Sequence, residues 1–165
     1  QVGAFRMLRR QDHAAITRAI ELVHLEAFAD RDVDTLSGGE RQRAWLALAL
    51  AQETAILALD EPTTFLDIGH QLEVLELVHE LNQTQGLTVL MVLHDLNHAA
   101  SFSDQMVVLN RGAIVRSGEP WSILQPDLLH EVFGVHASVI SEPHTGKPLI
   151  VSHSSAARAT LVNLA

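Results

Sequence analysis

A serine, two glycines and a glutamate stand directly before an expected helix, in positions suited to phosphate chemistry. Backbone N–H groups of Gly38 and Gly39 can approach a phosphate closely because no side chain shields them. The dipole of the following helix favours an anion at this end, and the Ser37 hydroxyl adds a further donor. We therefore expect Ser37, Gly38, Gly39 and Glu40 to form an anion-binding turn.

A helix cap is the simpler explanation of the same turn. Ser37 and Glu40 have the spacing of a capping box, in which each side chain bonds the backbone N–H group of the other residue. The four residues alone favour that explanation. The segment Arg41 to Arg43 and the motifs downstream favour a phosphate-sensing turn instead.

Two adjacent carboxylates, Asp60 and Glu61, follow a short apolar segment at residues 55–59. We expect a strand buried on both faces of a parallel sheet, and open α/β sheets bind ligands at the ends of such strands. Asp60 could hold Mg²⁺, usually through water, and Glu61 could deprotonate an attacking water. An exposed acidic turn before Pro62 is the alternative, which the continuation of the pattern to Asp67 disfavours.

His94 ends a second apolar segment, residues 87–93. A neutral imidazole at this position could bond a γ-phosphate or the attacking water. Taken alone, the residue is more simply a surface histidine, with Asp95 as the cap of the next helix. His98 has the spacing of a metal-binding partner, but no acidic residue completes a zinc motif.

Composition restricts the classes of protein. The 165 residues carry 20 acidic against 11 basic side chains, and the resulting formal charge of −9 disfavours nonspecific nucleic-acid binding. The absence of cysteine excludes disulfides and cysteine-based zinc sites. No segment has the apolar length of a membrane helix, and the first residues are too polar for a signal peptide. We expect one domain, or part of a larger one.

Apolar periodicity, caps and turn signals predict the elements that must position these residues. The expected helices cover residues 12–29, 37–52, 68–85, 96–102, 120–124 and 126–133. The expected strands cover residues 55–59, 87–93, 105–109, 113–116 and two pieces within 135–151. Alternation of helices and strands predicts an α/β domain with a mainly parallel sheet. Residues 152–165 are expected to form a flexible tail.

Three segments, Leu36 to Arg43, Ile56 to Asp67 and Leu90 to Asp95, together resemble the second half of an ABC transporter nucleotide-binding domain. The resemblance covers almost the whole chain, and the order and spacing of three motifs make it specific. It implies an α/β, P-loop NTPase-like fold. A partial ATPase domain would then span residues 1–151, as a helical signature region (1–52), a catalytic sheet (53–118) and C-terminal helices and strands (119–151).

The resemblance also implies a mechanism, in which ATP is hydrolysed at the interface of two nucleotide-binding subunits. The signature loop of one subunit closes on ATP held by the other. The implied roles are nucleotide binding for Ser37, Gly38, Gly39 and Glu40, the Mg²⁺ carboxylate for Asp60, the catalytic base for Glu61, the D-loop aspartate for Asp67 and the switch histidine for His94.

Features that are less specific than the three motifs indicate a subfamily. The segment from His94 to Ala100 and the tail from Val132 to Ile150 resemble importers of iron–siderophore, haem and cobalamin chelates, and the tail favours iron–siderophore members. The implied partners are a second nucleotide-binding subunit, transmembrane permease subunits and, indirectly, a substrate-binding protein, with no nucleic acid. The implied location is the cytoplasmic face of a bacterial-type membrane.

The 165 residues contain no G-x-x-x-x-G-K-[ST] phosphate loop. Gly146-Lys147 is not its end, because Pro148 stands where serine or threonine is required and no helix is expected to follow. We expect the phosphate loop, the adenine-stacking aromatic residue and the Q-loop to lie before Gln1. The chain alone should then have little or no ATPase activity.

Three alternatives remain at this point. An SMC-type, DNA-associated ATPase would share the signature loop but should carry long heptad coiled coils. A translation-associated ABC protein typically has Asn-His where Thr64-Phe65 stands. The third alternative is a truncated, non-catalytic remnant that binds no ATP by itself.

Overall fold

The computed structural model describes residues 10–155, which form two compact units. The contact pattern divides the chain between Val92 and Leu93. Unit 1 contains the described residues up to Val92, and unit 2 contains those from Leu93 onward. The boundary falls inside the region from 53 to 118 that was expected to be the catalytic sheet.

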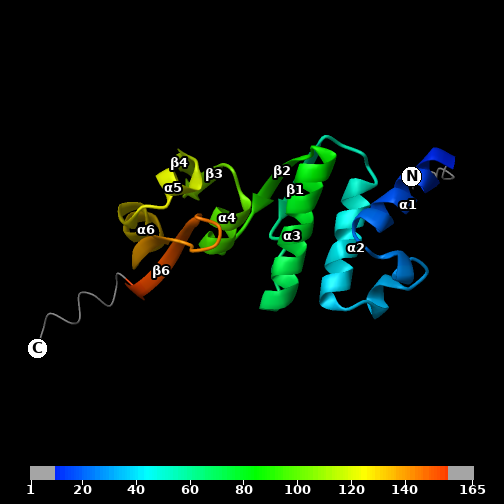
Figure 1. The fold of residues 1–165 in the computed structure, drawn as a ribbon, viewed down its shortest axis with the longest axis horizontal. Helices are drawn as coiled ribbons and strands as arrows, with labels where there is room; N and C mark the ends of the chain where they lie inside the picture. Colours follow the sequence, from blue (N-terminus) through cyan, green and yellow to red (C-terminus); the bar gives the residue numbers. More distant parts are fainter. Residues whose placement is uncertain (1–9, 156–165) are drawn as a thin grey trace, which may run out of the picture. The chain divides into compact units, whose positions relative to one another are not determined.

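Unit 1 is a parallel βαβ motif with two further α-helices and two short 3-10 helices (Figure 1). Its elements are α1 (Arg10–Leu22), η1 (Glu26–Phe28), η2 (Val33–Thr35), α2 (Gly38–Leu50), β1 (Ile56–Asp60), α3 (Ile68–Gln85) and β2 (Thr88–Val92). Strands β1 and β2 pair in parallel, from Ile56 opposite Thr88 to Asp60 opposite Val92. Helix α3 is the crossover that a parallel connection requires.

Apolar side chains of α3 form the centre of the unit 1 core. Leu77, Val78 and Leu81 are buried on one side of α3, and they pack with Leu57 of β1 and with residues of α1 and α2. Burial of each large apolar side chain stabilises the fold by roughly 1.5–3 kcal/mol. This packing holds α2 and α3 side by side, as Figure 1 shows.

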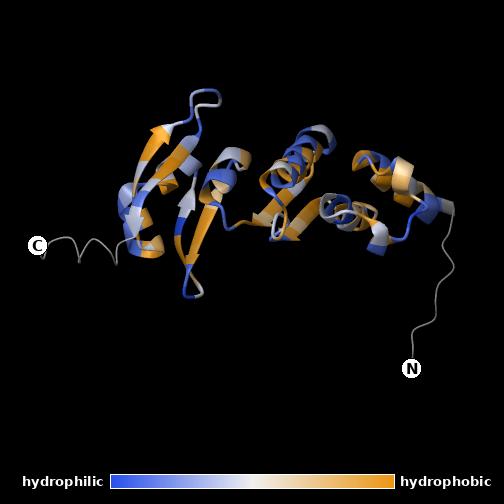
Figure 2. Cartoon of the chain, turned by 90° about the horizontal axis from the view of Figure 1, so that it is seen from below, coloured by the Kyte–Doolittle hydropathy of each residue, from blue (hydrophilic) through white to orange (hydrophobic). Residues whose placement is uncertain are grey.

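The parallel strand pair is buried on one face only, so the prediction that both faces are buried is wrong for the described residues. Leu57 is 4% exposed, whereas Ile56 is 62% and Leu90 63% exposed. Successive side chains of a strand point to opposite faces, and the helices of unit 1 cover only one of them. Figure 2 shows that both strands are nevertheless largely hydrophobic.

The first helix is shorter than predicted, because it ends at Leu22 rather than continuing to residue 29. His24 has a positive φ of 55°, which breaks the helical path. The Leu25 N–H group donates to the Ile20 carbonyl oxygen at 3.1 Å, the closing bond of a Schellman-type helix end. Apolar periodicity did not predict this helix end, and the sequence has no glycine there to mark it.

The predicted bounds of the third helix are confirmed. Asp67 caps the start of α3, and Gly86 ends it with a left-handed φ of 65°. A residue without Cβ adopts that conformation at little cost, which is why glycine is common after helices.

Unit 2 consists of short helices with two antiparallel strand pairs. Its elements are α4 (Leu96–Phe102), β3 (Met106–Asn110), β4 (Ala113–Gly118), α5 (Pro120–Ile123), α6 (Pro126–Phe133), β5 (Val135–Ser141) and β6 (Pro148–Ser155). The predicted hairpin between β3 and β4 is confirmed, and its turn residues Arg111 and Gly112 both have positive φ. Asn97 joins α4 to β6 through two hydrogen bonds, of 2.7 and 3.3 Å, to the backbone of Ile150.

The α/β class is confirmed, with a correction to the sheet. In residues 10–155 only β1 and β2 pair in parallel, and the other two pairs are antiparallel. Short turns join β3 to β4 and β5 to β6, and such connections allow only antiparallel pairing. Strand β6 runs to Ser155, so the first four residues of the predicted flexible tail are in a strand. The remainder of that segment lies outside the described residues.

Candidate functional site

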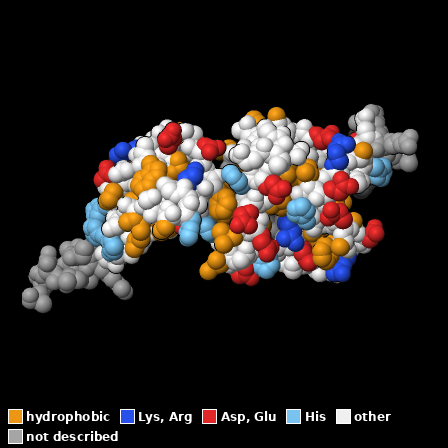
Figure 3. Space-filling view, viewed as in Figure 1, with side chains coloured by type: hydrophobic (Ala, Val, Ile, Leu, Met, Phe, Trp, Pro, Cys, Tyr) orange, Lys and Arg blue, Asp and Glu red, His pale blue; other side chains and the backbone are white. Residues whose placement is uncertain are grey.

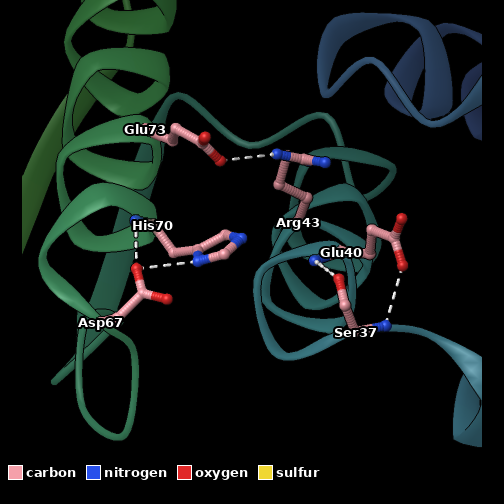
Figure 4. A network of polar contacts seen from close by, with 6 residues as sticks. All are labelled: Ser37, Glu40, Arg43, Asp67, His70 and Glu73. Atoms are coloured by element: carbon pink, nitrogen blue, oxygen red, sulfur yellow. Dashed lines mark hydrogen bonds and ion pairs between the residues drawn. The ribbon is translucent and has the colours of Figure 1, made fainter.

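The turn before α2 has the capping-box geometry that its spacing predicts. The Ser37 Oγ accepts a hydrogen bond from the Glu40 N–H group at 3.3 Å, and the Ser37 N–H group donates to Glu40 Oε2 at 2.8 Å (Figure 4). The backbone hydrogen bond from Ser37, followed by the bond with its side chain, lowers the pKa of the Glu40 carboxyl. Glu40 is therefore an anionic cap that fixes the conformation of Ser37.

The two glycines supply the donors of this turn. Gly38 and Gly39 are the first two residues of α2, so helix geometry gives their N–H groups no acceptor within the helix. The positive end of the helix dipole lies at the same position. This geometry suits an anion such as a phosphate.

Both glycines lie against the segment that leads into α3. A Cβ atom on Gly39 would stand 2.4 Å from His70 Cδ2, which no real side chain tolerates. A Cβ on Gly38 would stand 3.5 Å from Leu66 Cδ2, an ordinary contact. The turn before α2 and residues 66–70 are thus packed together within unit 1, and only Gly39 is strictly required there by space.

Asp67 is the N-cap of α3. Its Oδ1 accepts hydrogen bonds from the His70 N–H group at 3.0 Å and from the His70 Nδ1 at 2.9 Å (Figure 4). The backbone bond to His70, then the side-chain bond, lowers the pKa of the Asp67 carboxyl. Asp67 therefore orients the imidazole that touches Gly39.

The carboxylate pair lies at the carboxyl end of β1. Asp60 is the last residue of the strand and is exposed. Glu61 has a left-handed φ of 50°, unusual for a residue with a side chain. The Thr64 hydroxyl donates to Glu61 Oε2 at 3.1 Å. Sparsely populated backbone conformations cluster at functional sites, and this one turns the chain sharply after Asp60.

The donor set at this strand end fits Mg²⁺ better than a tightly caged metal. In residues 10–155 no three His, Cys, Asp or Glu side chains are arranged to hold a metal ion. Mg²⁺ keeps several waters and is often held by one or two carboxylates together with substrate phosphates. The exposed Asp60 carboxylate suits that mode.

His94 belongs to unit 2, immediately before the capped start of α4. It is exposed, and Asp95 caps α4 by accepting from the N–H groups of Asn97 at 2.8 Å and His98 at 3.0 Å. The capping role foreseen for Asp95 is confirmed. The Nδ1 atom of His98 is buried and has no hydrogen-bond partner.

Sequence reasoning missed two features of the site. The first is His70, although an aspartate three residues before a histidine at a helix start is a recognisable capping pattern. The second is Phe65, whose side chain is 101% exposed on a backbone with φ of 65°. No sequence signal identified that strained and exposed phenylalanine.

Residues 3–64 match the ABC transporter family. The chain is 46% identical, over 92% of its length, to the iron(3+)-hydroxamate import ATP-binding protein FhuC of Bacillus subtilis (strain 168). It is 47% identical, over 89% of its length, to the ferric enterobactin transport ATP-binding protein FepC of Escherichia coli (strain K12). The chain spans 56% and 54% of these two relatives, about half of each.

Solved structures show the same fold. An inward-facing ABC transporter of the metal-chelate type superposes with a TM-score of 0.83 at 28% identity, covering 97% of this chain and 63% of that one. A dimeric ATP-binding cassette bound to ADP and Pi superposes with a TM-score of 0.57 at 31% identity, covering 73% of this chain and 51% of that one. The predicted P-loop NTPase-like fold is therefore confirmed.

Proposed function

Because the chain belongs to the ABC transporter family of ATP-binding proteins, we propose that it forms the signature and catalytic-carboxylate part of an importer's ATPase subunit. The observation that carries the proposal is the turn before α2. Gly38 and Gly39 offer two N–H donors at a helix N-terminus, and Glu40 locks the adjacent Ser37 in place. Similarity to an import ATP-binding protein at 46% identity and to a transport ATP-binding protein at 47% identity supports the same assignment.

In the proposed mechanism the turn acts across a dimer of two such subunits. The N–H groups of Gly38 and Gly39 donate to the γ-phosphate of ATP held by the partner subunit. The Ser37 Oγ accepts from Glu40 N–H, so its own hydroxyl hydrogen can be donated to a phosphate oxygen. Closure thereby places fixed dipoles where charge develops, which is the main contribution to phosphoryl transfer.

The two carboxylates at the end of β1, Asp60 and Glu61, have separate roles in the proposed mechanism. Asp60 would hold Mg²⁺, which neutralises phosphate charge when bound. Glu61 accepts the proton of the attacking water, and the hydrogen bond from Thr64 orients its carboxylate. Asp67, in the turn that follows, is proposed as the D-loop aspartate. His94 hydrogen-bonds the γ-phosphate or that water.

A metal chelate of the iron–siderophore class is the proposed cargo. An iron(3+)-hydroxamate import ATP-binding protein and a ferric enterobactin transport ATP-binding protein are both similar to the chain. Its proposed partners are a second ATPase subunit, transmembrane permease subunits and, indirectly, a substrate-binding protein at the cytoplasmic face of the membrane. In residues 10–155 no helix has the length and apolarity to cross a membrane. Figure 3 shows acidic side chains spread over the visible face of unit 1, which fits a role without nucleic acid.

A hybrid cassette tests this proposal. In it the chain replaces the segment that it matches in the ferric enterobactin transport ATP-binding protein of Escherichia coli. We expect the hybrid cassette to restore growth on ferric enterobactin in cells that lack the native subunit, and Glu61→Gln to abolish that growth. A folded hybrid that hydrolyses ATP but never supports uptake would contradict the importer assignment.

The truncated-remnant alternative keeps one observation in its favour. The 165 residues hold no phosphate loop, and nothing in them replaces its lysine and its backbone cradle. We therefore propose that the chain by itself does not turn over ATP.

A further inference from the structure

A histidine from α3 occupies the space that Gly39 leaves open at the start of α2. An ideal Cβ on Gly39 would stand 2.4 Å from His70 Cδ2, 3.2 Å from Cγ and 3.3 Å from Nε2. Gly39 is buried and the His70 side chain is 43% exposed, so the Cδ2 edge of the imidazole lies against the first helical turn while the rest of the ring meets solvent. Figure 4 shows the ring reaching from α3 toward α2.

Asp67 fixes the direction of that imidazole. One oxygen, Oδ1, accepts both the His70 backbone N–H at 3.0 Å and the ring Nδ1 at 2.9 Å. The ring cannot turn away from Gly39 without losing its bond to Asp67. The bond also assigns a proton to Nδ1, because the carboxylate can only accept.

A second bridge joins the same helices one turn farther along. Arg43 Nη1 lies 3.3 Å from Glu73 Oε2, and the Arg43 side chain is only 22% exposed. This ion pair ties α2 to α3 but does not involve the residues of the first turn of α2. At that first turn it is His70 that fills the space beside Gly39.

We infer that His70 is a positioning residue, which sets the direction of the Gly38 and Gly39 N–H groups by packing against Gly39. The inference rests on the proposed function of the turn from Ser37 to Glu40. We call the contact of His70 with Gly39, together with the bond from His70 to Asp67, the clamp. Through Asp67, the clamp also couples the turn after the carboxylate pair to the anion-binding turn of the same subunit. A shift of residues 62–67 would therefore be transmitted to α2.

Amide hydrogen exchange tests the clamp without any reference to ATP. The useful amides are those of Glu40 and Arg41, whose acceptors are the Ser37 Oγ at 3.3 Å and the Ser37 carbonyl at 2.8 Å. We expect His70→Ala to speed their exchange by about tenfold, because local opening becomes easier when the packed ring is lost. The measurement is made on the full 165-residue chain and on the hybrid cassette.

Two variants control for general damage. His70→Asn places an amide N–H where Nδ1 lies and its amide oxygen where Cδ2 lies. The bond to Asp67 and the nearest contact with Gly39 are both retained, so exchange should stay near the original rate. Glu73→Gln removes the second bridge and should leave exchange at Glu40 and Arg41 unchanged. Unchanged exchange in His70→Ala would overturn the inference, as would an equal effect from Glu73→Gln.

A double-mutant cycle identifies the contact itself. Gly39→Ala should disrupt the turn in the original background, because its Cβ meets the ring at 2.4 Å. Combination with His70→Ala removes the clash and should restore exchange toward the rate of His70→Ala alone. Gly38→Ala, with its ordinary 3.5 Å contact to Leu66, should show no such coupling to position 70. Additive effects of Gly39→Ala and His70→Ala would contradict direct packing.

Turnover by the hybrid cassette separates this inference from the proposed function. His70→Ala should lower kcat about tenfold or more while leaving ATP affinity of the monomer unchanged, since a misplacement of about 1 Å can cost on the order of 100-fold. Faster exchange with a lower kcat supports the inference. Faster exchange with full turnover would overturn the positioning role alone, because the proposed function of the turn fails only if Ser37→Arg also leaves turnover intact.

Discussion

The backbone N–H group of Glu61 donates a hydrogen bond to the carbonyl oxygen of Val92 at 3.1 Å. This bond extends the parallel pairing of β1 and β2 by one residue beyond Asp60, and Glu61 then leaves the strand with φ of 50°. A glutamate is thus anchored by its backbone at the edge of the sheet, with Thr64 donating to its side chain. A backbone held in this way suits a general base, whose carboxylate must keep a fixed position relative to one water molecule.

Substitution of Glu61 by glutamine should trap the ATP-bound dimer of the hybrid cassette. Glutamine preserves the shape of the side chain and can still accept from Thr64, but it cannot take a proton from water. Size-exclusion chromatography with ATP and Mg²⁺ should show a stable dimer, and steady-state ATPase should fall by about two to four orders of magnitude. Hydrolysis near the original rate would show that Glu61 is not the base.

The isolated 165-residue chain should show little or no ATPase activity. Phosphate loops supply a lysine, a backbone cradle and a hydroxyl ligand for Mg²⁺, and this sequence contains no replacement for them. Phosphate release by the purified chain should equal that of its Glu61→Gln variant. Turnover that is well above this control would refute the expectation.

Glu142 should make the stability of unit 2 depend on pH in acid. Its Oε2 accepts from Thr145 Oγ1 at 2.8 Å and from the N–H groups of Thr145 at 2.6 Å and His144 at 3.0 Å. These bonds, with the Thr145 side chain first, lower the pKa of Glu142 below its ordinary value of 4.5. A lowered pKa in the folded state stabilises the protein above the unfolded value, and the stabilisation disappears as pH falls through the folded value.

Urea unfolding of the chain and of Glu142→Gln at several pH values measures this linkage. The original chain should be more stable at pH 7, and the difference should shrink below pH 4.5. Glu131→Gln, at an exposed position of α6, is the matched control for the loss of one surface carboxylate. A constant difference between the chain and Glu142→Gln across this range would contradict the role of the carboxylate.

Local signals in the sequence were sufficient for most elements of the fold. The capping box at Ser37 and Glu40, the cap Asp67 and the stop at Gly86 placed α2 and α3 correctly. These signals act between residues that are close in the chain. The end of α1 at Leu22 was missed because a histidine, not a glycine, takes the left-handed position.

Tertiary contacts explain what the sequence could not reveal about the site. The spacing of Ser37 and Glu40 predicted a capping box, and that geometry is confirmed. The contact of Gly39 with His70 joins residues from two helices, so no local sequence pattern predicts it. Burial of only one face of β1 likewise depends on which elements cover the strand, a property that an apolar run cannot specify.

Replacement of Ser37 by arginine should abolish turnover of the hybrid cassette while leaving the ATP affinity of the monomer nearly intact. In a two-fold symmetric dimer each signature turn serves the partner's site, so Ser37 meets ATP only across the interface. A bulky cation would block the close approach that Gly38 and Gly39 permit. Nucleotide bound by the isolated subunit would be unaffected, because the phosphate loop holds it.

Loss of the helix cap is the competing explanation, and Ser37→Ala isolates it. Alanine removes the bond from Glu40 N–H without adding bulk, at a cost of about 1 kcal/mol of stability, too little to unfold a typical domain. Ser37→Ala should therefore retain much more turnover than Ser37→Arg at equal stability. ATP affinity is measured under conditions that prevent dimerisation, beside steady-state ATPase. Full turnover by Ser37→Arg, or equal losses in both variants, would mean that Ser37 acts only as a cap.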